Sequence, residues 1–264
     1  MREFFQVGWT WYPSVVIGFS LWTLLYTLAI WRDRSTSLIR QIAFHIGTLV
    51  GLIALLSPLD ELGDEYLFSA HMVQHLLLMF GAAPLWLVGA SGWMIDRFLP
   101  RRLTPLVQWL VSPVPAFLVF VGVMWFWHVP AFYQTALEHE GVHIFEHLTF
   151  IGAALIGWWP VLGPKTTRIF KPEPPLRMLY LFLLAVPCTV LAAILSFAHA
   201  ALYPFYVTVS HPFGMNALQD QHLGGLLMWL PTHFVLLVML GFTFLKWFAE
   251  SNRQSNQELA ESLS

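Results

Sequence analysis

The chain has 264 residues, of which 57% are hydrophobic and only 11% are charged, against about a quarter charged in a typical soluble domain. This composition excludes a soluble globular protein and a disordered one, and the net charge of -2 leaves no basic surface for nucleic acid. The single cysteine, Cys188, excludes a disulfide framework and a CxxC thiol pair. The remaining class is a membrane protein with several spans, in which 13 Trp and 11 His stand out.

Seven apolar stretches are long enough to cross a bilayer, which takes about 20 mostly apolar residues. In chain order they are Pro13–Trp31, Arg40–Ser57, Tyr66–Gly89, Val114–Phe132, Val142–Leu162, Arg177–Ala200 and His222–Phe248. The start of the fourth depends on Pro113 and Pro115, because proline tolerates the first turn of a helix but not its interior. The sequence therefore predicts an all-α bundle of seven transmembrane helices over residues 1–248, followed by a polar tail at 249–264.

The basic residues are distributed very unevenly between the two sides of this bundle. Twelve fall in the first, third and fifth loops or at the C-terminal end, whereas Arg2 alone lies on the other side. The twelve are Arg32, Arg34, Arg40, Arg97, Arg101, Arg102, Lys165, Arg168, Lys171, Arg177, Lys246 and Arg253. Because Lys and Arg accumulate in cytoplasmic loops, this predicts an outside N-terminus and a cytoplasmic C-terminus and tail.

The histidines gather on the opposite side, and only His45 lies toward the cytoplasm. The ten outer histidines are His71, His75, His128, His139, His143, His147, His199, His211, His222 and His233. Any single one, including His45 and His199, can be read as a hydrogen-bonded packing residue. That reading does not explain ten on one side, and polar residues at membrane depth are costly enough to indicate function.

Two histidine pairs have the spacing of metal ligands. His71 and His75, like His143 and His147, are separated by four residues and so share a helix face. Two such pairs, with His128 nearby, can converge on one ion, and neutral imidazole suits Zn, Cu, Fe and Ni. Met72, Met79, Met215 and Met228 are possible soft ligands for Cu(I), although methionine in an apolar bundle is more often a filler.

An acidic segment, Asp60-Glu61-Leu62-Gly63-Asp64-Glu65, precedes the third span. It is expected either to be an ordinary solvated loop or to attract cations toward the histidines. Asp60 lies close to the membrane edge, where its carboxylate could orient a ligand imidazole.

Two overlapping patterns resemble those of zinc proteases. Residues 139–143 read HExxH and residues 143–147 read HxxEH, each with two histidines and a glutamate that could act as a general base. Gly141 and the polar residues before it suggest that the first pattern straddles a helix start. The alternative reading of Glu140 and Glu146 is a solvated helix N-terminus, where acidic side chains are favoured.

Several longer motifs occur in a fixed order along the chain. They are Ser57-Pro58-Leu59-Asp60, His71-Met72-Val73-Gln74-His75-Leu76-Leu77-Leu78, Trp127-His128-Val129-Pro130, His143-Ile144-Phe145-Glu146-His147, Trp158-Trp159-Pro160, and Asp220-Gln221 through Gly224-Gly225 to Met228-Trp229. This series resembles the CtaG family of bacterial cytochrome c oxidase assembly factors, from Arg40 to about Pro231.

The resemblance implies a seven-span protein of the bacterial plasma (inner) membrane that matures a haem–copper oxidase by binding or delivering copper at the outer face. Its partners would be oxidase subunits or a copper donor protein, and no reaction is required of it, so it is not expected to be an enzyme. The implied ligand set is His71, His75, His128, His143 and His147, with Asp60 and Asp220 as residues that orient ligands or guide the ion; histidine is not required at 139, 222 or 233.

Other functions stay open at this point. A haem-binding electron carrier would use histidines on facing helices as axial ligands, and a zinc protease would use Glu140 or Glu146 as its base. A metal transporter is disfavoured because His45 is the only evident ligand in the cytoplasmic half.

Overall fold

The computed structural model describes residues 8–33, 35–209 and 214–263, and every regular element in these ranges is helical. The longer helices are α1 (Pro13–Arg32), α2 (Leu38–Leu56), α4 (Phe68–Leu76), which continues through η2 (Leu77–Ala82) and α5 (Ala83–Gly89), α8 (Pro113–His128), α10 (Glu140–Leu162), α11 (Pro174–Ser196) and α13 (Ala217–Leu263). The shorter ones are α3 (Pro58–Glu65), α6 (Gly92–Phe98), η3 (Arg101–Leu103), α7 (Thr104–Leu110), α9 (Pro130–Glu138) and α12 (Pro204–Thr208). The predicted all-α membrane class is confirmed.

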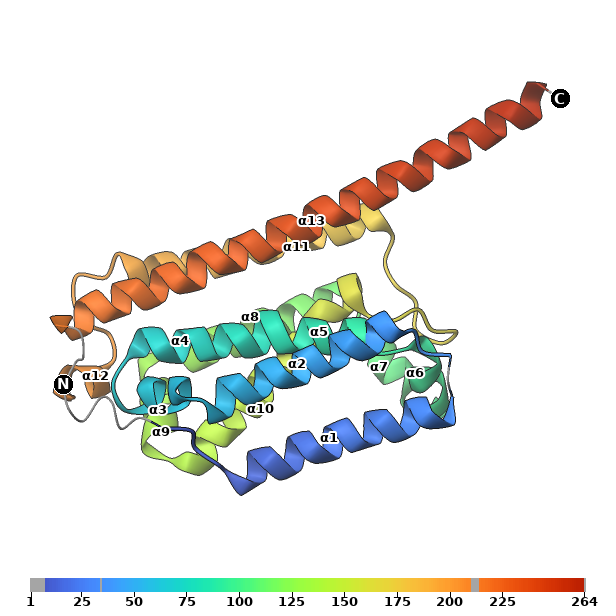
Figure 1. The fold of residues 1–264 in the computed structure, drawn as a ribbon. Coiled ribbons are helices and arrows are strands. Elements are labelled where there is room, and N and C mark those ends of the chain that lie inside the picture. Colours follow the sequence, from blue (N-terminus) through green and yellow to red (C-terminus); the bar gives the residue numbers. More distant parts are fainter. Residues whose placement is uncertain (1–7, 34, 210–213, 264) are drawn as a thin grey trace.

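In the described ranges, six helical segments are long and apolar enough to span a membrane. They are α1, α2, the continuous segment Phe68–Gly89, α10, α11 and Ala217–Glu258 within α13. In Figure 1 these helices run side by side, with α1 along one side of the bundle, α11 and α13 together along the opposite side, and the end of α13 projecting beyond it. The polar residues after Phe248 continue this last helix.

The fourth predicted span, Val114–Phe132, is shorter in the structure. Helix α8 has 16 residues and ends at His128, because Val129 is extended and Pro130 begins a new helix. It reaches spanning length only together with Arg101–Leu110, from which it is bent by 69°. The structure therefore supports six spans, or seven if this bent pair counts as one.

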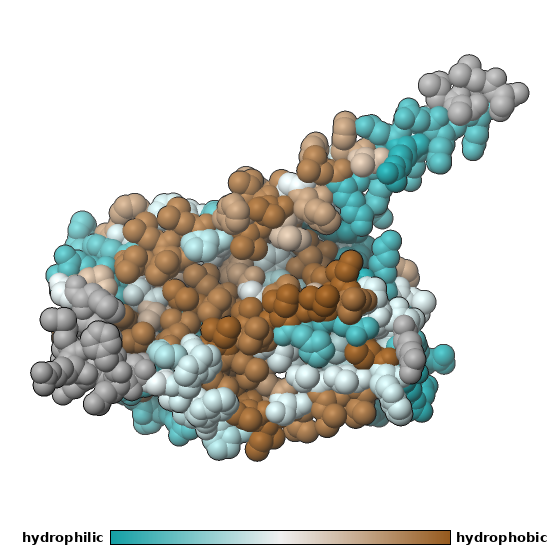
Figure 2. Space-filling model, viewed as in Figure 1, coloured by the Kyte–Doolittle hydropathy of each residue, from teal (hydrophilic) through white to brown (hydrophobic). Residues whose placement is uncertain are grey.

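Apolar side chains cover much of the outside of the bundle. In α1 most side chains are exposed and apolar and Tyr26 alone is buried, as expected for a helix that faces lipid. Figure 2 shows apolar residues across the body of the molecule and hydrophilic ones on the projecting end of α13. Large aromatic residues such as Phe120, Phe150 and Trp158 fill the interior.

The orientation predicted from the basic residues can be measured directly. A reporter that is active only outside the cytoplasm, fused after Phe248, should be silent, because the twelve basic residues hold their loops on the cytoplasmic side. The same reporter fused in the segment between α9 and α10, near His139, should be active. An active Phe248 fusion would contradict the topology and place the histidines on the cytoplasmic side.

Candidate metal centre

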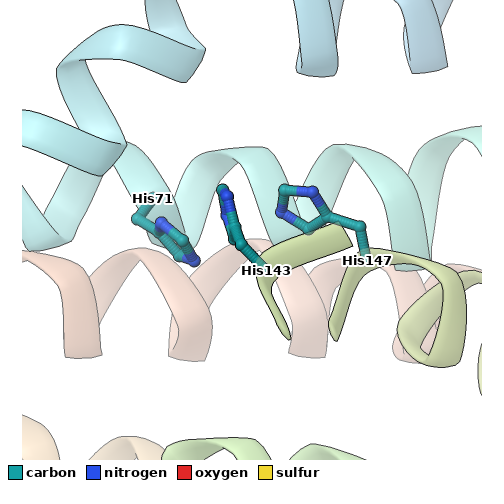
Figure 3. Close-up of side chains that lie close together, drawn as sticks. All are labelled: His71, His143 and His147. Carbon is teal, nitrogen blue, oxygen red and sulfur yellow. The ribbon is translucent and has the colours of Figure 1, made fainter. Parts of the chain in front are cut away.

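Two histidine pairs, one on α4 and one on α10, face each other inside the bundle. The ring centroids of His71 and His75 lie 4.2 Å apart, and those of His143 and His147 lie 4.3 Å apart. Between the helices, the His71 and His143 centroids are 5.4 Å apart, as are those of His75 and His147. Figure 3 shows His71, His143 and His147 close together. The structure therefore brings together the two pairs that share ligand spacing in the sequence.

Two overlapping sets of donor atoms are compact enough to hold an ion. Donor atoms of His71, His143 and His147 all lie within 4.8 Å of one another, and so do those of His71, His75 and Glu146. Two ligands at about 2.0–2.3 Å from one tetrahedral ion lie about 3.3–3.8 Å apart. Small side-chain movements would bring either set to that separation, and His71 belongs to both.

Two carboxylates complete this cluster, and neither is among the residues singled out as ligands from the sequence. The Asp64 oxygens lie 3.3 Å from Nδ1 of His71 and 3.4 Å from Nδ1 of His143, so one carboxylate bridges both helices. The Glu146 oxygens lie 3.9 Å from Nε2 of His71 and 3.8 Å from Nε2 of His75. A carboxylate beside Nδ1 orients an imidazole so that Nε2 is left for a metal ion.

The cluster contains an unusual concentration of unsatisfied polar atoms. Nε2 of all four histidines and both Glu146 oxygens are buried and have no hydrogen-bond partner among the described residues. The Glu146 side chain is fully buried. Burying such groups without partners costs about 1–3 kcal/mol each, whereas a bound cation would satisfy the members of either three-residue set. The residues present therefore fit a transition-metal ion with imidazole and carboxylate ligands.

The acidic segment before α4 is a helix rather than a loop, which corrects the expectation of an ordinary solvated loop. Helix α3 begins at Pro58, and the Ser57 hydroxyl accepts a hydrogen bond from the Leu59 N–H. Asp60 and Asp64 lie one turn apart on this helix. Gly63 allows α3 to pack against α4, since a Cβ there would lie 2.9 Å from Cα of His71.

Asp60 is hydrogen-bonded to Gln74 of α4 rather than to an imidazole. Its carboxylate accepts a hydrogen bond of 2.5 Å from Nε2 of Gln74, which also donates to the Ala54 carbonyl at 3.0 Å. Burial, together with the negative charge of Asp64, raises the pKa of Asp60 to about 7. Burial likewise raises the pKa of Asp64 to about 6, although His143 opposes this shift. Both carboxyl groups would hold their charge more readily beside a bound cation.

Asp220 holds the start of α4 in place. Its Oδ2 accepts a hydrogen bond of 2.6 Å from the Phe68 N–H, and its Oδ1 accepts bonds from the N–H and hydroxyl of Ser69. A carboxylate in this position satisfies helix N–H groups that have no partner within the helix. Asp220 thus positions the helix that carries His71 and His75.

The remaining histidines are outside the two donor sets. His128 is buried, with its ring centroid 6.4 Å from that of His75, and its Nε2 lies 3.4 Å from the Met72 sulfur. His222 and His233 are hydrogen-bonded to α11 or the segment after it. His45, His139 and His199 are exposed, and His211 lies outside the described residues.

The structure separates the two protease-like patterns. His139 is the residue before α10, and both it and Glu140 are exposed, so the HExxH pattern straddles the helix start as predicted. The reading of Glu146 as a solvated residue is wrong, because the face of α10 that carries His143 and His147 turns it into the bundle. The HxxEH pattern places Glu146 beside two histidines and could have indicated that it is buried with them.

A family model matches most of the chain. The model of the cytochrome c oxidase caa3 assembly factor family matches residues 24–250. The chain belongs to this family. The matched range contains the sequence motifs that resemble this family, both histidine pairs and the acidic helix α3.

Two mycobacterial relatives of undetermined function are similar over most of the chain. An uncharacterized protein of Mycobacterium leprae is 24% identical over 236 residues, which is 81% of this chain and 35% of that protein. An uncharacterized protein of Mycobacterium bovis is 22% identical over 210 residues, which is 73% of this chain and 32% of that protein. The chain thus spans about a third of the length of these relatives. No solved structure matches it.

Proposed function

We propose that this assembly factor binds copper in the cluster formed by His71, His75, His143, His147 and Glu146 and supplies it to a haem–copper oxidase in the bacterial plasma membrane. The observation that carries the proposal is the set of four buried Nε2 atoms and one buried carboxylate that have no hydrogen-bond partner among the described residues. The family supports a role in oxidase assembly, and an oxidase with haem and copper needs a supply of both.

The geometry favours an ion over the alternatives. Imidazole and carboxylate groups converge from two helices on one small volume, whereas haem needs two axial ligands on opposite faces of a large flat ring. A zinc protease of the HExxH type would need Glu140, which is exposed. The HxxEH pattern would make Glu146 a general base, but its distances of 3.9 and 3.8 Å from the His71 and His75 imidazoles support a role as a ligand.

The outer face is the proposed place of copper transfer. The cluster lies at the end of the bundle that carries α3 and α9, away from the loops with the twelve basic residues. Under the predicted topology this end faces away from the cytoplasm. Copper is here a cargo and no chemical step is required of the protein, so we propose a binding and delivery role with oxidase subunits or a copper donor protein as partners.

Metal analysis of the purified full chain tests this proposal. We expect about one copper ion per chain, retained through dialysis or acquired when copper is supplied, because buried imidazole ligands bind Cu more tightly than other first-row divalent ions. An absorption spectrum of the same sample should lack haem bands. Stoichiometric zinc without copper, or a haem spectrum, would contradict the proposal.

A further inference from the structure

A small cavity lies next to the histidine cluster and is lined mainly by sulfur and aromatic side chains. Four of the nine methionines of the chain contribute to it. Its lining residues are Met72, Met79, Met124, Met228, Cys188, His75, His128, Leu76, Phe80 and Thr232. Its volume is about 20 Å³, which is enough for one water-sized group.

The tautomer of His128 leaves its Nε2 unprotonated and next to the Met72 sulfur. Nδ1 of His128 lies 2.6 Å from the Met124 carbonyl oxygen, which can only accept, so Nδ1 carries the proton. In the neutral imidazole Nε2 is then an unprotonated acceptor, and its neighbour at 3.4 Å is the Met72 sulfur, which has no proton to donate. Simple packing by methionine does not explain why two lone-pair donors face each other in the interior.

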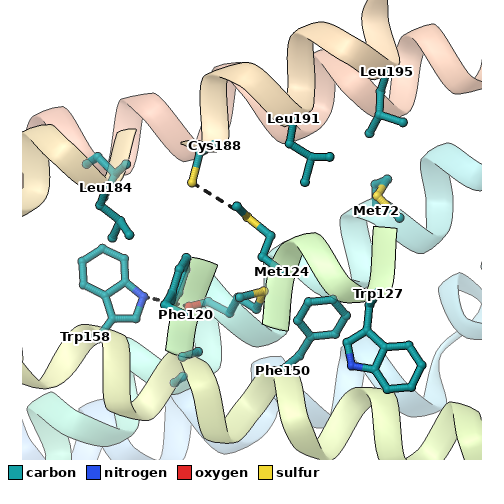
Figure 4. Close-up of a cluster of buried hydrophobic side chains, with 14 of the residues drawn as sticks. Met72, Phe120, Met124, Trp127, Phe150, Trp158, Leu184, Cys188, Leu191 and Leu195 are labelled. Atoms are coloured by element: carbon teal, nitrogen blue, oxygen red, sulfur yellow. Dashed lines mark hydrogen bonds between the residues drawn. The ribbon is translucent and has the colours of Figure 1, made fainter. Parts of the chain in front are cut away.

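Two pairs of donor atoms on the cavity wall lie at or close to the separation of ligands that share an ion. Nε2 of His128 and the Met72 sulfur are 3.4 Å apart, and the sulfur atoms of Cys188 and Met124 are 3.9 Å apart (Figure 4). Two ligands of one tetrahedral ion lie about 3.3–3.8 Å apart when each bond is about 2.0–2.3 Å. The three helices that carry these residues, α4, α8 and α11, pack around the cavity.

The chemistry of the lining selects a soft monovalent ion. Thioether and thiol sulfur are soft ligands that favour Cu(I), whereas carboxylate and carbonyl oxygens suit harder ions. No carboxylate is among the residues that line this cavity. A monovalent ion also needs less compensating charge in an apolar interior than a divalent one.

His75 connects the cavity to the metal centre. Its Nε2 lies 3.8 Å from Glu146 in the cluster, while its ring also lines the cavity. We propose that the cavity is a second metal site, formed by Met72, Met124, His128 and Cys188, which takes Cu(I) and adjoins the imidazole–carboxylate site through His75. This second site deepens the proposed function and rests on it only for the origin of the ion. Copper enters the site as Cu(I), so no redox step is involved.

Anaerobic titration of the full chain in detergent tests this site, with a Cu(I) chelator as competitor. The wild-type protein should bind a second equivalent of Cu(I) beyond the one retained on purification, and should also bind Ag(I). The double variant Met72→Leu/Met124→Leu should bind this second equivalent at least about 10-fold more weakly, since loss of even an outer contact costs about 10–100-fold. Leucine keeps the side-chain volume, so folding should be retained.

The controls separate this inference from the proposed function. Met178→Leu, which is not in the cavity lining, should leave both equivalents unchanged. His143→Ala should weaken the first equivalent but leave Ag(I) binding intact, because His143 does not line the cavity. Copper X-ray absorption of the His143→Ala protein should then show sulfur ligands at about 2.3 Å.

Two outcomes would overturn the inference. One is Ag(I) and Cu(I) binding that is equal in the wild type and in Met72→Leu/Met124→Leu, and the other is a copper shell without sulfur in His143→Ala. If the double variant does not fold, Met72→Leu alone, which removes one of the proposed ligands, replaces it with the same readout. Ag(I) binding that requires Met72 and Met124 in a protein whose cluster binds no copper would support the cavity site while the proposed function fails.

Discussion

Replacing His71 and His75 together by alanine should abolish copper retention. Both rings are buried and neither Nε2 has a hydrogen-bond partner among the described residues, so each substitution would remove a proposed ligand atom from beside Glu146. Loss of groups that merely orient ligands costs about 10–100-fold in metal affinity, so loss of two ligands should cost at least about 100-fold. Metal analysis after dialysis against a competing chelator measures the effect.

A matched control removes two other imidazoles. His45 and His199 are exposed and stand apart from the cluster, so His45→Ala/His199→Ala should retain copper like the wild type. A thermal melt of each variant, made in the absence of copper, separates loss of ligands from loss of fold. Equal retention by the two double variants would show that the cluster on α4 and α10 is not the binding site.

The two histidine pairs could be predicted from the sequence more readily than the residues around them. A separation of four residues places His71 with His75 and His143 with His147 on helix faces whatever the tertiary structure, so the pairs follow from helical geometry. That the two faces meet depends on how α4 and α10 are arranged in the bundle, which local spacing does not determine. For the same reason, local spacing could not show that Asp64 contacts His71 and His143.

Contacts between distant segments account for the other differences. Asp220 lies 152 residues from Phe68, to whose N–H it is hydrogen-bonded, so no local pattern reveals its role at the start of α4. The short fourth span has a local cause that the hydropathy masked, because Val129-Pro130 interrupts an apolar run with an extended residue and a new helix start. By contrast, Gly141 and the preceding polar residues correctly indicated where α10 begins.

The burial of Glu146 likewise depends on contacts between helices that are distant in the sequence. The helix dipole favours solvated acidic residues in the first turn of a helix, whereas Glu146 lies in the second turn of α10. It lies one residue before His147 on the inward face, and its burial becomes understandable only when His71 and His75 of α4 are seen beside it.

Cells of the native host that lack this protein should make oxidase polypeptide and haem but have little oxidase activity. The reason is that copper delivery raises the local metal supply, and added copper should partly restore activity by mass action. His143→Ala and His147→Ala should each resemble the deletion, since each removes one ligand of a shared site. Oxidase activity in membranes, with immunodetection of the polypeptide and a haem spectrum, provides the measurement. Normal activity in the deletion strain would refute a role in assembly.

Substitution of the two glutamates distinguishes delivery from hydrolysis in the same strains. Glu140→Gln should be nearly harmless, because Glu140 is exposed and copper handling needs no base there. Glu146→Gln should reduce both bound copper and oxidase activity, because an amide replaces a buried carboxylate within 4 Å of two imidazoles and carries no charge to stabilise the ion. A protease that used Glu146 as its base would instead lose activity while the metal stayed bound, since the general base is not required to hold the ion. Metal content measured beside activity in Glu146→Gln therefore decides whether this carboxylate is a ligand or a base.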